Sequence, residues 1–217
     1  MPPDDSSTRT PLITASLRAR QSPRFTALYD ALVGHLRAVG AGRSAVAVGD
    51  PFPDFLLPAG GRLLRRADVG AGRPLILSFV RGLWCPYCRT ALGALRAIAP
   101  AVAAAGGTIA VATPEANGLA GRLERDFDAA FTVLCDLDLG LSLACGLAFP
   151  VPEELRLAYR EIGVDLAVRQ DNGGWLLPIP ATFVLDRDGI VRFAHVDADF
   201  RDRPDPALFL DALRRCA

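Results

Sequence analysis

The stretch from residue 74 to residue 113 constrains the fold of this chain more than any other. Residues 74–80, Pro-Leu-Ile-Leu-Ser-Phe-Val, form a short apolar run that is typical of a strand buried on both faces. A helical pattern follows from about residue 86 to residue 104, and a second apolar run occupies residues 108–113. This strand–helix–strand order predicts two parallel strands joined by a right-handed crossover, and therefore an α/β fold.

Shorter patterns before and after this unit complete the predicted order of elements. The sequence predicts a small hairpin turning at Gly60-Gly61 and a late hairpin turning at residues 187–189. It also predicts a strand at 131–135 and helices near residues 117–127, 139–145, 152–162 and 205–215. Together these elements indicate a central mixed β-sheet flanked by helices.

Two regions differ in character along the chain. Residues 1–47 are expected to be a flexible N-terminus plus a helical extension, because residues 1–23 are polar and Pro-containing, whereas residues 25–39 have apolar side chains at helical spacing. Residues 48–217 are expected to form the main domain, with an insertion near residues 147–178.

Composition excludes several function classes. The 24 basic residues balance the 24 acidic ones, so no overall charge attracts a nucleic acid or a membrane surface. All of the basic residues are arginines, which excludes catalysis by a Schiff-base or P-loop lysine. No apolar run is long enough to cross a membrane, and the acidic N-terminus does not resemble a signal peptide, so we expect a cytoplasmic protein.

The cysteines point to redox chemistry. There are five, at positions 85, 88, 135, 145 and 216, and an odd number without an export signal argues against a framework of structural disulfides. Cys85 and Cys88 form a Cys-Pro-Tyr-Cys motif with no second such motif and no neighbouring histidine, so no zinc site is expected. The motif indicates a redox-active dithiol; the alternative is two buried cysteines that only pack as small hydrophobic residues.

The position of the motif favours the reactive interpretation. Cys85 lies where a buried strand ends, and Cys88 lies in the first turn of the next helix, where unpaired N–H groups and the helix dipole lower the pKa of a thiol. Pro86 suits the first helical position because its missing N–H would have had no partner. Trp84 and Tyr87 are expected to cover the two sulfurs and, with Pro86 and Pro180, to line the substrate pocket.

Four segments in one order resemble a known family. They are residues 49–58, residues 79–88 with Phe-Val-Arg-Gly-Leu-Trp-Cys-Pro-Tyr-Cys, residues 178–189, and residues 194–197. From about residue 48 to its end the chain resembles peroxiredoxin-like proteins of the alkyl hydroperoxide reductase and thiol-specific antioxidant (AhpC/TSA) group, which have a thioredoxin-like fold. The resemblance implies a thiol peroxidase with a hydroperoxide substrate, an external thiol reductant of thioredoxin or glutathione type, no cofactor, no metal, and a possible homodimer.

The resemblance also assigns roles to individual residues. In the family pattern, Arg81 stands in the place of a proline, Cys85 in the place of a threonine that binds peroxide, and Cys88 in the place of the peroxidatic cysteine. Thioredoxins and glutaredoxins instead attack with the first cysteine, here Cys85. Arg203 falls where the family has an arginine that stabilises the thiolate, and Pro180 where thioredoxin-like sheets have a cis-proline beside the sulfurs.

Three functions are therefore open at the level of sequence. The first is a thiol peroxidase that passes through a sulfenic acid to an intramolecular disulfide. The second is a thioredoxin- or glutaredoxin-like oxidoreductase that exchanges with protein or glutathione disulfides, and the third is a redox-sensing domain without turnover. The expected exposure of Cys85 favours it weakly over Cys88 as the attacking thiol. Cys135 and Cys145 are expected to be core residues, with a resolving role for Cys145 as the alternative, and Cys216 to be incidental.

Overall fold

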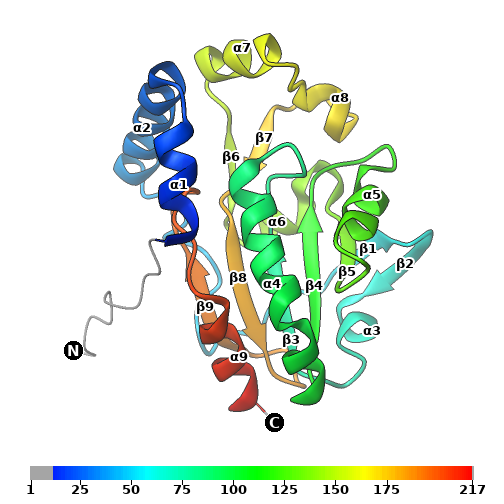
Figure 1. The fold of residues 1–217 in the computed structure, drawn as a ribbon. Helices are drawn as coiled ribbons and strands as arrows, with labels where there is room; N and C mark the ends of the chain where they lie inside the picture. Colours follow the sequence, from blue (N-terminus) through cyan, green and yellow to red (C-terminus); the bar gives the residue numbers. More distant parts are fainter. Residues whose placement is uncertain (1–11, 217) are drawn as a thin grey trace.

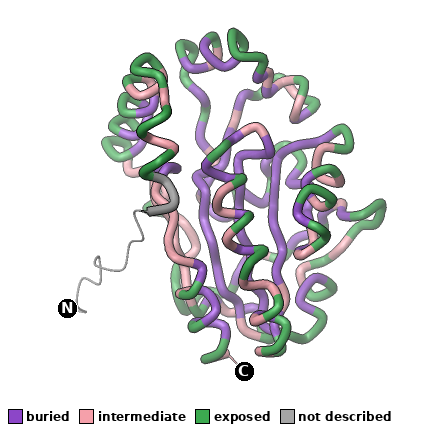
Figure 2. Tube along the Cα trace, viewed as in Figure 1, coloured by how far each residue is buried: buried purple, intermediate pink, exposed green. Residues whose placement is uncertain are grey.

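The computed structural model describes residues 12–216. A five-stranded mixed sheet in the order β5-β4-β3-β8-β9 forms its centre (Figure 1). The central strands β3 (Leu75–Phe79), β4 (Thr108–Thr113) and β5 (Thr132–Cys135) are parallel, while β8 (Ala181–Leu185) runs antiparallel to β3 and β9 (Val191–Val196) antiparallel to β8. Every residue of β3 and β8 is buried, as expected for strands covered on both faces (Figure 2).

Helices cover the sheet. The crossover helix α4 (Pro86–Ala104) packs beside the closing helix α9 (Pro206–Arg214), and α5 (Leu119–Asp126) packs on β5. The N-terminal helices α1 (Leu12–Arg20) and α2 (Pro23–Ala38) stand at one side of the molecule, where α1 contacts α4 and α2 contacts α7 (Glu153–Glu161) (Figure 1).

Small elements complete the structure. The hairpin of β1 (Leu56–Ala59) and β2 (Arg62–Arg65) turns at Gly60-Gly61 as predicted and lies beside β5. The other small elements are α3 (Arg66–Gly70), η1 (Leu137–Leu139), α6 (Gly140–Ala144), β6 (Ala148–Pro150), α8 (Leu166–Gln170) and β7 (Leu176–Pro178). Strands β6 and β7 pair with each other at the two ends of the expected insertion.

The N-terminal region differs from the expectation in one respect. Residues 12–20 form helix α1 although they have no clear apolar period, and the remaining residues of the expected loose segment, 1–11, lie outside the described residues. Contacts made far along the chain stabilise α1: Leu17 packs against the core, and Arg18 pairs with two aspartates after β9. Within residues 12–216, no helix is both long and apolar enough to cross a membrane.

Candidate active site

The cysteine pair lies at the carboxyl end of the parallel strands. Cys85 is the residue before helix α4, with extended backbone angles, and Pro86 is the first helical residue, as predicted. Both sulfurs are free thiols and both residues are buried, with 1% of Cys85 and none of Cys88 exposed. The exposure expected for Cys85 is therefore absent, because both cysteines are buried.

Two donors converge on the Cys88 sulfur. The backbone N–H of Arg81 lies 3.3 Å from Cys88 Sγ, and the Nη2 of Arg203 lies 3.6 Å from the same atom. Arg203 and Cys88 lie 115 positions apart in the sequence, and the structure brings them together, as expected from the family's thiolate-stabilising arginine. Burial, together with the hydrogen bond to Cys85 and the nearby Cys85 charge, nevertheless raises the pKa of Cys88 well above that of a free thiol, against the effect of Arg203 and Arg81.

The charges around the pair favour the thiolate form of Cys85 over that of Cys88. Burial opposes the ionisation of Cys85, but a hydrogen bond from Cys88 and the charges of Arg81 and Arg203 outweigh burial and lower the pKa of Cys85 to about 6. Because the sulfurs share one negative charge, stabilising it on Cys85 keeps the proton on Cys88. The preference for Cys85 therefore rests on charge and not on exposure.

Arg81 lies completely buried beside this pair, inside a cluster of aromatic rings. Its guanidinium carbon is 4.0 Å from the ring centre of Phe200 and 4.8 Å from that of Trp84, and its Nη2 donates to the hydroxyl of Tyr159. The ring of Tyr29 completes the cluster at 6.0 Å. These aromatic residues come from α2, the loop before α4, α7 and the loop after β9.

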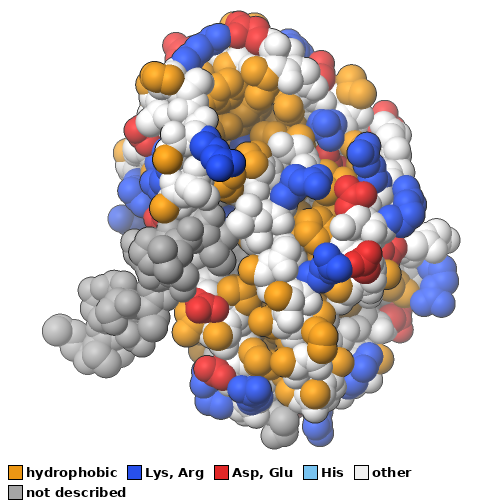
Figure 3. Space-filling view, in the orientation of Figure 1, with side chains coloured by type: hydrophobic (Ala, Val, Ile, Leu, Met, Phe, Trp, Pro, Cys, Tyr) orange, Lys and Arg blue, Asp and Glu red, His pale blue; other side chains and the backbone are white. Residues whose placement is uncertain are grey.

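A hollow opens outside the same cluster. It measures about 250 Å³ and lies between the N-terminal helices and the α7–α8 connection, where hydrophobic side chains line it (Figure 3). Trp84, Pro86 and Tyr87 form its wall toward the cysteines, as do Tyr29 and Phe25 of α2. Pro86 is exposed to this space, whereas Tyr87 is buried and donates its hydroxyl to Gln21 Oε1 at 2.7 Å.

Pro180 is near the site, but its peptide bond is not the one predicted. No cis peptide bond occurs among the described residues, so the Ile179–Pro180 bond is trans. The backbone runs almost directly from β7 into β8 here and makes no tight turn that would favour the cis form, which is the less stable isomer by about 0.5–1 kcal/mol. Buried Pro180 lines a small cavity of about 20 Å³ together with Thr182, His195 and Arg203.

The loop between β3 and the cysteines is fixed by a carboxylate. Glu115, which follows β4, accepts a hydrogen bond from the backbone N–H of Leu83 at 2.6 Å and pairs with Arg169 at 2.8 Å. Burial raises the pKa of Glu115, while the Leu83 N–H and Arg169 act in the opposite direction. Glu115 therefore holds the segment that carries Arg81 and Trp84.

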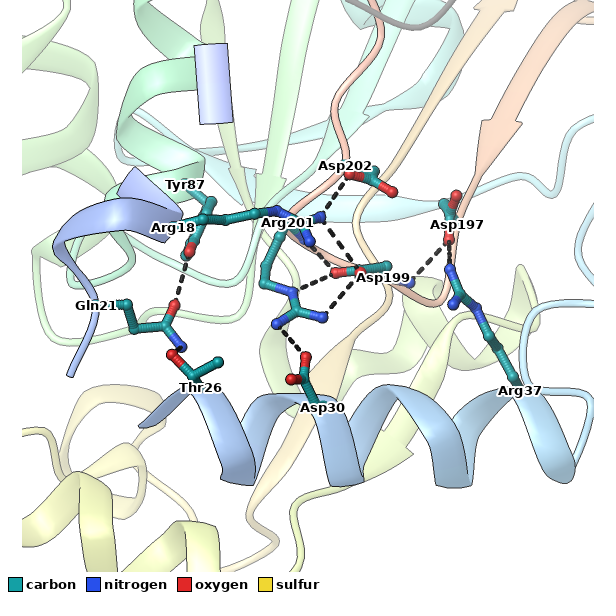
Figure 4. Close-up of polar contacts among 10 residues, drawn as sticks. All are labelled: Arg18, Gln21, Thr26, Asp30, Arg37, Tyr87, Asp197, Asp199, Arg201 and Asp202. Atoms are coloured by element: carbon teal, nitrogen blue, oxygen red, sulfur yellow. Dashed lines mark hydrogen bonds and ion pairs between the residues drawn. The ribbon is translucent and has the colours of Figure 1, made fainter. Parts of the chain in front are cut away.

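Ion pairs fix the loop that carries Arg203 to the N-terminal helices (Figure 4). Arg201 is buried and binds Asp199 at 2.7 Å and Asp30 of α2 at 2.6 Å. Arg18 of α1 reaches Asp202 at 2.6 Å and Asp199 at 3.3 Å. The N-terminal extension thus takes part in positioning the site.

The other cysteines lie apart from this arrangement. Cys135 and Cys145 are buried, as expected for core residues, and burial raises the pKa of Cys145 to about 12. Cys216 is half-buried, and its thiol donates to the backbone oxygen of Ala212. Among residues 12–216, no group of three or more His, Cys, Asp or Glu side chains could hold a metal ion.

Sequence reasoning missed three members of the site. The sequence marks Arg81 only as the residue in the place of the family's proline, and it gives no role to Tyr159 or Glu115. Glu115 had a usable signal, because it directly follows a parallel strand at the edge where ligand-binding residues gather. Tyr159 lies in the expected insertion, where no local pattern connects it to residue 81.

Comparisons with known proteins agree on family and fold. The model of the AhpC/TSA family matches residues 48–194, and no match was found among curated proteins. The structure is similar to that of peroxidoxin BcpB from Mycobacterium tuberculosis, with a TM-score of 0.61 at 18% identity over 79% of this chain and 99% of that one. It is also similar to that of reduced Prx3 from Vibrio vulnificus, with a TM-score of 0.59 at 20% identity over 77% of this chain and 98% of that one. A third similar structure is that of peroxiredoxin Q from Xanthomonas campestris, with a TM-score of 0.58 at 18% identity over 79% of this chain and 98% of that one. At such low identity these similarities establish the thioredoxin-like, peroxiredoxin-type fold.

Proposed function

The chain belongs to the AhpC/TSA family, and on that premise we propose that it is a thiol peroxidase whose redox centre is the Cys85–Cys88 pair. The observation that carries the proposal is that the Arg203 guanidinium and the Arg81 N–H converge on the Cys88 sulfur, one of two paired cysteines at a helix N-terminus. Positive groups there stabilise a thiolate, which is the form of cysteine that reacts with peroxide.

In the proposed reaction, Cys85 attacks first. Its thiolate attacks one oxygen of the hydroperoxide, the O–O bond breaks, and the alcohol leaves after taking up a proton. Cys88 then attacks the sulfenic acid on Cys85, forming the disulfide and releasing water. Two equivalents of an external thiol, of thioredoxin or glutathione type, restore the dithiol. Such a cycle fits the cytoplasm that we expect for this chain.

Burial of the dithiol favours this function over the alternative of protein disulfide exchange. A small peroxide needs only a slight movement of Trp84 or Tyr87 to reach a sulfur. A protein disulfide needs an exposed nucleophile, and in the reduced form neither cysteine is exposed.

The test is steady-state turnover of hydrogen peroxide and of an organic hydroperoxide, each supplied with a thioredoxin system and with glutathione. We expect peroxide turnover that is lost in Cys85→Ser and reduced in Cys88→Ser, whereas Cys216→Ser, the control, retains it. Reduction of protein disulfides without peroxide turnover would instead identify a dithiol–disulfide oxidoreductase.

The order of attack has a separate test, a probe that traps sulfenic acids. Cys88→Ser is expected to label at Cys85 after peroxide treatment. Rapid labelling at Cys88 in Cys85→Ser, together with no labelling in Cys88→Ser, would assign the attack to Cys88.

A further inference from the structure

Arg81 is a buried cation without a carboxylate partner. It is 0% exposed, its Nε and Nη1 have no hydrogen-bond partner among the residues that the structure describes, and its Nη2 donates to the hydroxyl of Tyr159. Arg201 shows what a buried arginine of this chain usually has, since it is paired with both Asp199 and Asp30. Within residues 12–216, Arg81 has no such ion pair.

The aromatic rings around Arg81 do not replace an anion. Phe200 and Trp84 lie close enough to the guanidinium for cation–π attraction. That attraction is weaker than the cost of removing a guanidinium from water, and a buried charge without an ionic partner is strongly destabilising. Two nitrogens of Arg81, Nε and Nη1, also remain available to donate to such a partner. An uncompensated charge at this place therefore indicates that an anion forms beside it during function.

We propose that Arg81 is the counter-ion of the Cys85 thiolate, so that the reduced dithiol neutralises the buried charge and its oxidation leaves that charge unpaired. Arg81 is a positioning residue in this scheme, because it acts through Cys85. The inference rests on the proposed function only in taking Cys85 and Cys88 as the redox pair.

The electrostatics of the site agree with this assignment. The Cys85 charge favours the protonated form of Arg81, and the charge of Arg81 in turn lowers the pKa of Cys85. The other groups that interact with Cys85 come from four elements: Cys88 and Tyr87 of α4, Tyr29 of α2, Tyr159 of α7, and Arg203 of the loop after β9. Apart from the two sulfurs, the anionic forms of these groups are phenolates, and the pKa values of the three tyrosines are raised, chiefly by burial. At neutral pH the anion near Arg81 is therefore the thiolate of the cysteine pair, whose charge the arginines favour on Cys85.

Oxidation removes this anion. The thiolate of Cys85, the thiol of Cys88, the hydroperoxide and one proton become the disulfide, an alcohol and water, so the two electrons go to the O–O bond and the negative charge disappears. Arg81 then lies buried with no counter-ion. The oxidised form therefore bears the cost of a buried charge without a partner, which the reduced form avoids.

The first experiment measures the pKa of Cys85 by the ultraviolet absorbance of the thiolate. It uses Cys88→Ser, which keeps a hydroxyl donor beside Cys85, and subtracts the titration of the double variant Cys85→Ser/Cys88→Ser. Adding Arg81→Met is expected to raise the thiol pKa by about 1–3 units, the range for loss of a neighbouring opposite charge. Adding Arg81→Lys is expected to preserve most of the lowered pKa. Arg89→Met, the matched control, removes an arginine whose side chain is 53% exposed and is expected to change nothing.

The second experiment compares the melting temperatures of the reduced and oxidised proteins. Oxidation is expected to lower the melting temperature of the wild type more than that of Arg81→Met, because the variant has no buried charge that oxidation leaves unpaired. If Arg81 has a purely structural role, Arg81→Met is expected to lower the melting temperature of the reduced and oxidised proteins alike and to leave the pKa of Cys85 unchanged. Should Arg81→Met not fold, Arg81→Gln supplies the same two readouts.

The outcomes separate this inference from the proposed function. An unchanged pKa of Cys85 on removal of the Arg81 charge would overturn the inference even if peroxide turnover were intact. A raised pKa in a protein without peroxide turnover would support the inference and overturn the proposed function.

Discussion

Glu115 occupies the space that a side chain at Gly82 would need. Gly82 has a φ of +133°, and a Cβ added there would lie 2.6 Å from the carboxyl carbon of Glu115. The same carboxylate accepts the Leu83 N–H, so the absence of a side chain at position 82 lets Glu115 hold the loop before the cysteines.

Gly82→Ala is therefore expected to destabilise the protein by about 2–4 kcal/mol, because it adds backbone strain to a steric clash. Urea unfolding measures the change. The control is Gly93→Ala in α4, where an added Cβ meets nothing within 4 Å and helix propensity predicts an unchanged or higher stability. Equal effects of the two substitutions would contradict the role of Glu115.

Asp199→Asn is expected to cost about 3 kcal/mol, since it leaves buried Arg201 without its main partner. Hydrogen bonds and the charge of Arg201, against burial, hold the pKa of Asp199 below its ordinary value of about 4. A lowered carboxyl pKa stabilises the folded state above the unfolded pKa, and this contribution is lost as the pH falls through the folded pKa. The difference between wild type and variant should thus shrink below about pH 4.

The control for this prediction is Asp211→Asn, which removes an exposed carboxylate paired with Arg214 and is expected to change the stability by less than about 0.5 kcal/mol. A constant difference between wild type and Asp199→Asn from pH 7 to pH 2 would show that the ionised pair contributes nothing.

The reduced protein should become more stable relative to Cys85→Ser as the pH rises from about 6 to about 8.5. The pKa of Cys85 is about 6 in the folded protein, against about 8.5 in an unfolded chain. The thiolate therefore stabilises the folded state fully above the unfolded pKa, and this stabilisation is lost as the pH falls through the folded pKa. A gain on the order of 1–3 kcal/mol is expected from unfolding curves measured with reductant present. If the free energies of unfolding of the two proteins change with pH in parallel, Cys85 is not the residue that carries the thiolate.

Mild oxidation should join Cys85 to Cys88 and leave Cys135 and Cys145 free. The i, i+3 offset at a helix start brings the first two sulfurs together, whereas burial raises the pKa of both other thiols and slows their reaction. Peptide mapping after one equivalent of hydrogen peroxide measures the pairing. Disulfides that include Cys145 would revive the alternative that it is the resolving cysteine.

Strong local patterns made most of the central sheet and helix α4 predictable. Residues 108–113 and 86–104 form a strand and a helix with the predicted bounds, because an apolar run and a periodic stripe each determine the structure locally. Helix α1 and the short strands β6 and β7 were missed, since partners far along the chain stabilise them. For the same reason the Cys-Pro-Tyr-Cys motif was recognisable, whereas the environment of Arg81, built from four distant segments, was not.

The ion pairs of Arg18 and Asp30 also determine the order in which the protein is completed during synthesis. Their partners Asp199, Arg201 and Asp202 lie 171 to 184 positions later in the chain. A chain leaving the ribosome N-terminus first therefore makes both N-terminal helices early, but these ion pairs form only after the final strand has emerged. Arg203, in the same late loop, reaches the Cys88 sulfur only when nearly the whole chain is outside the ribosome.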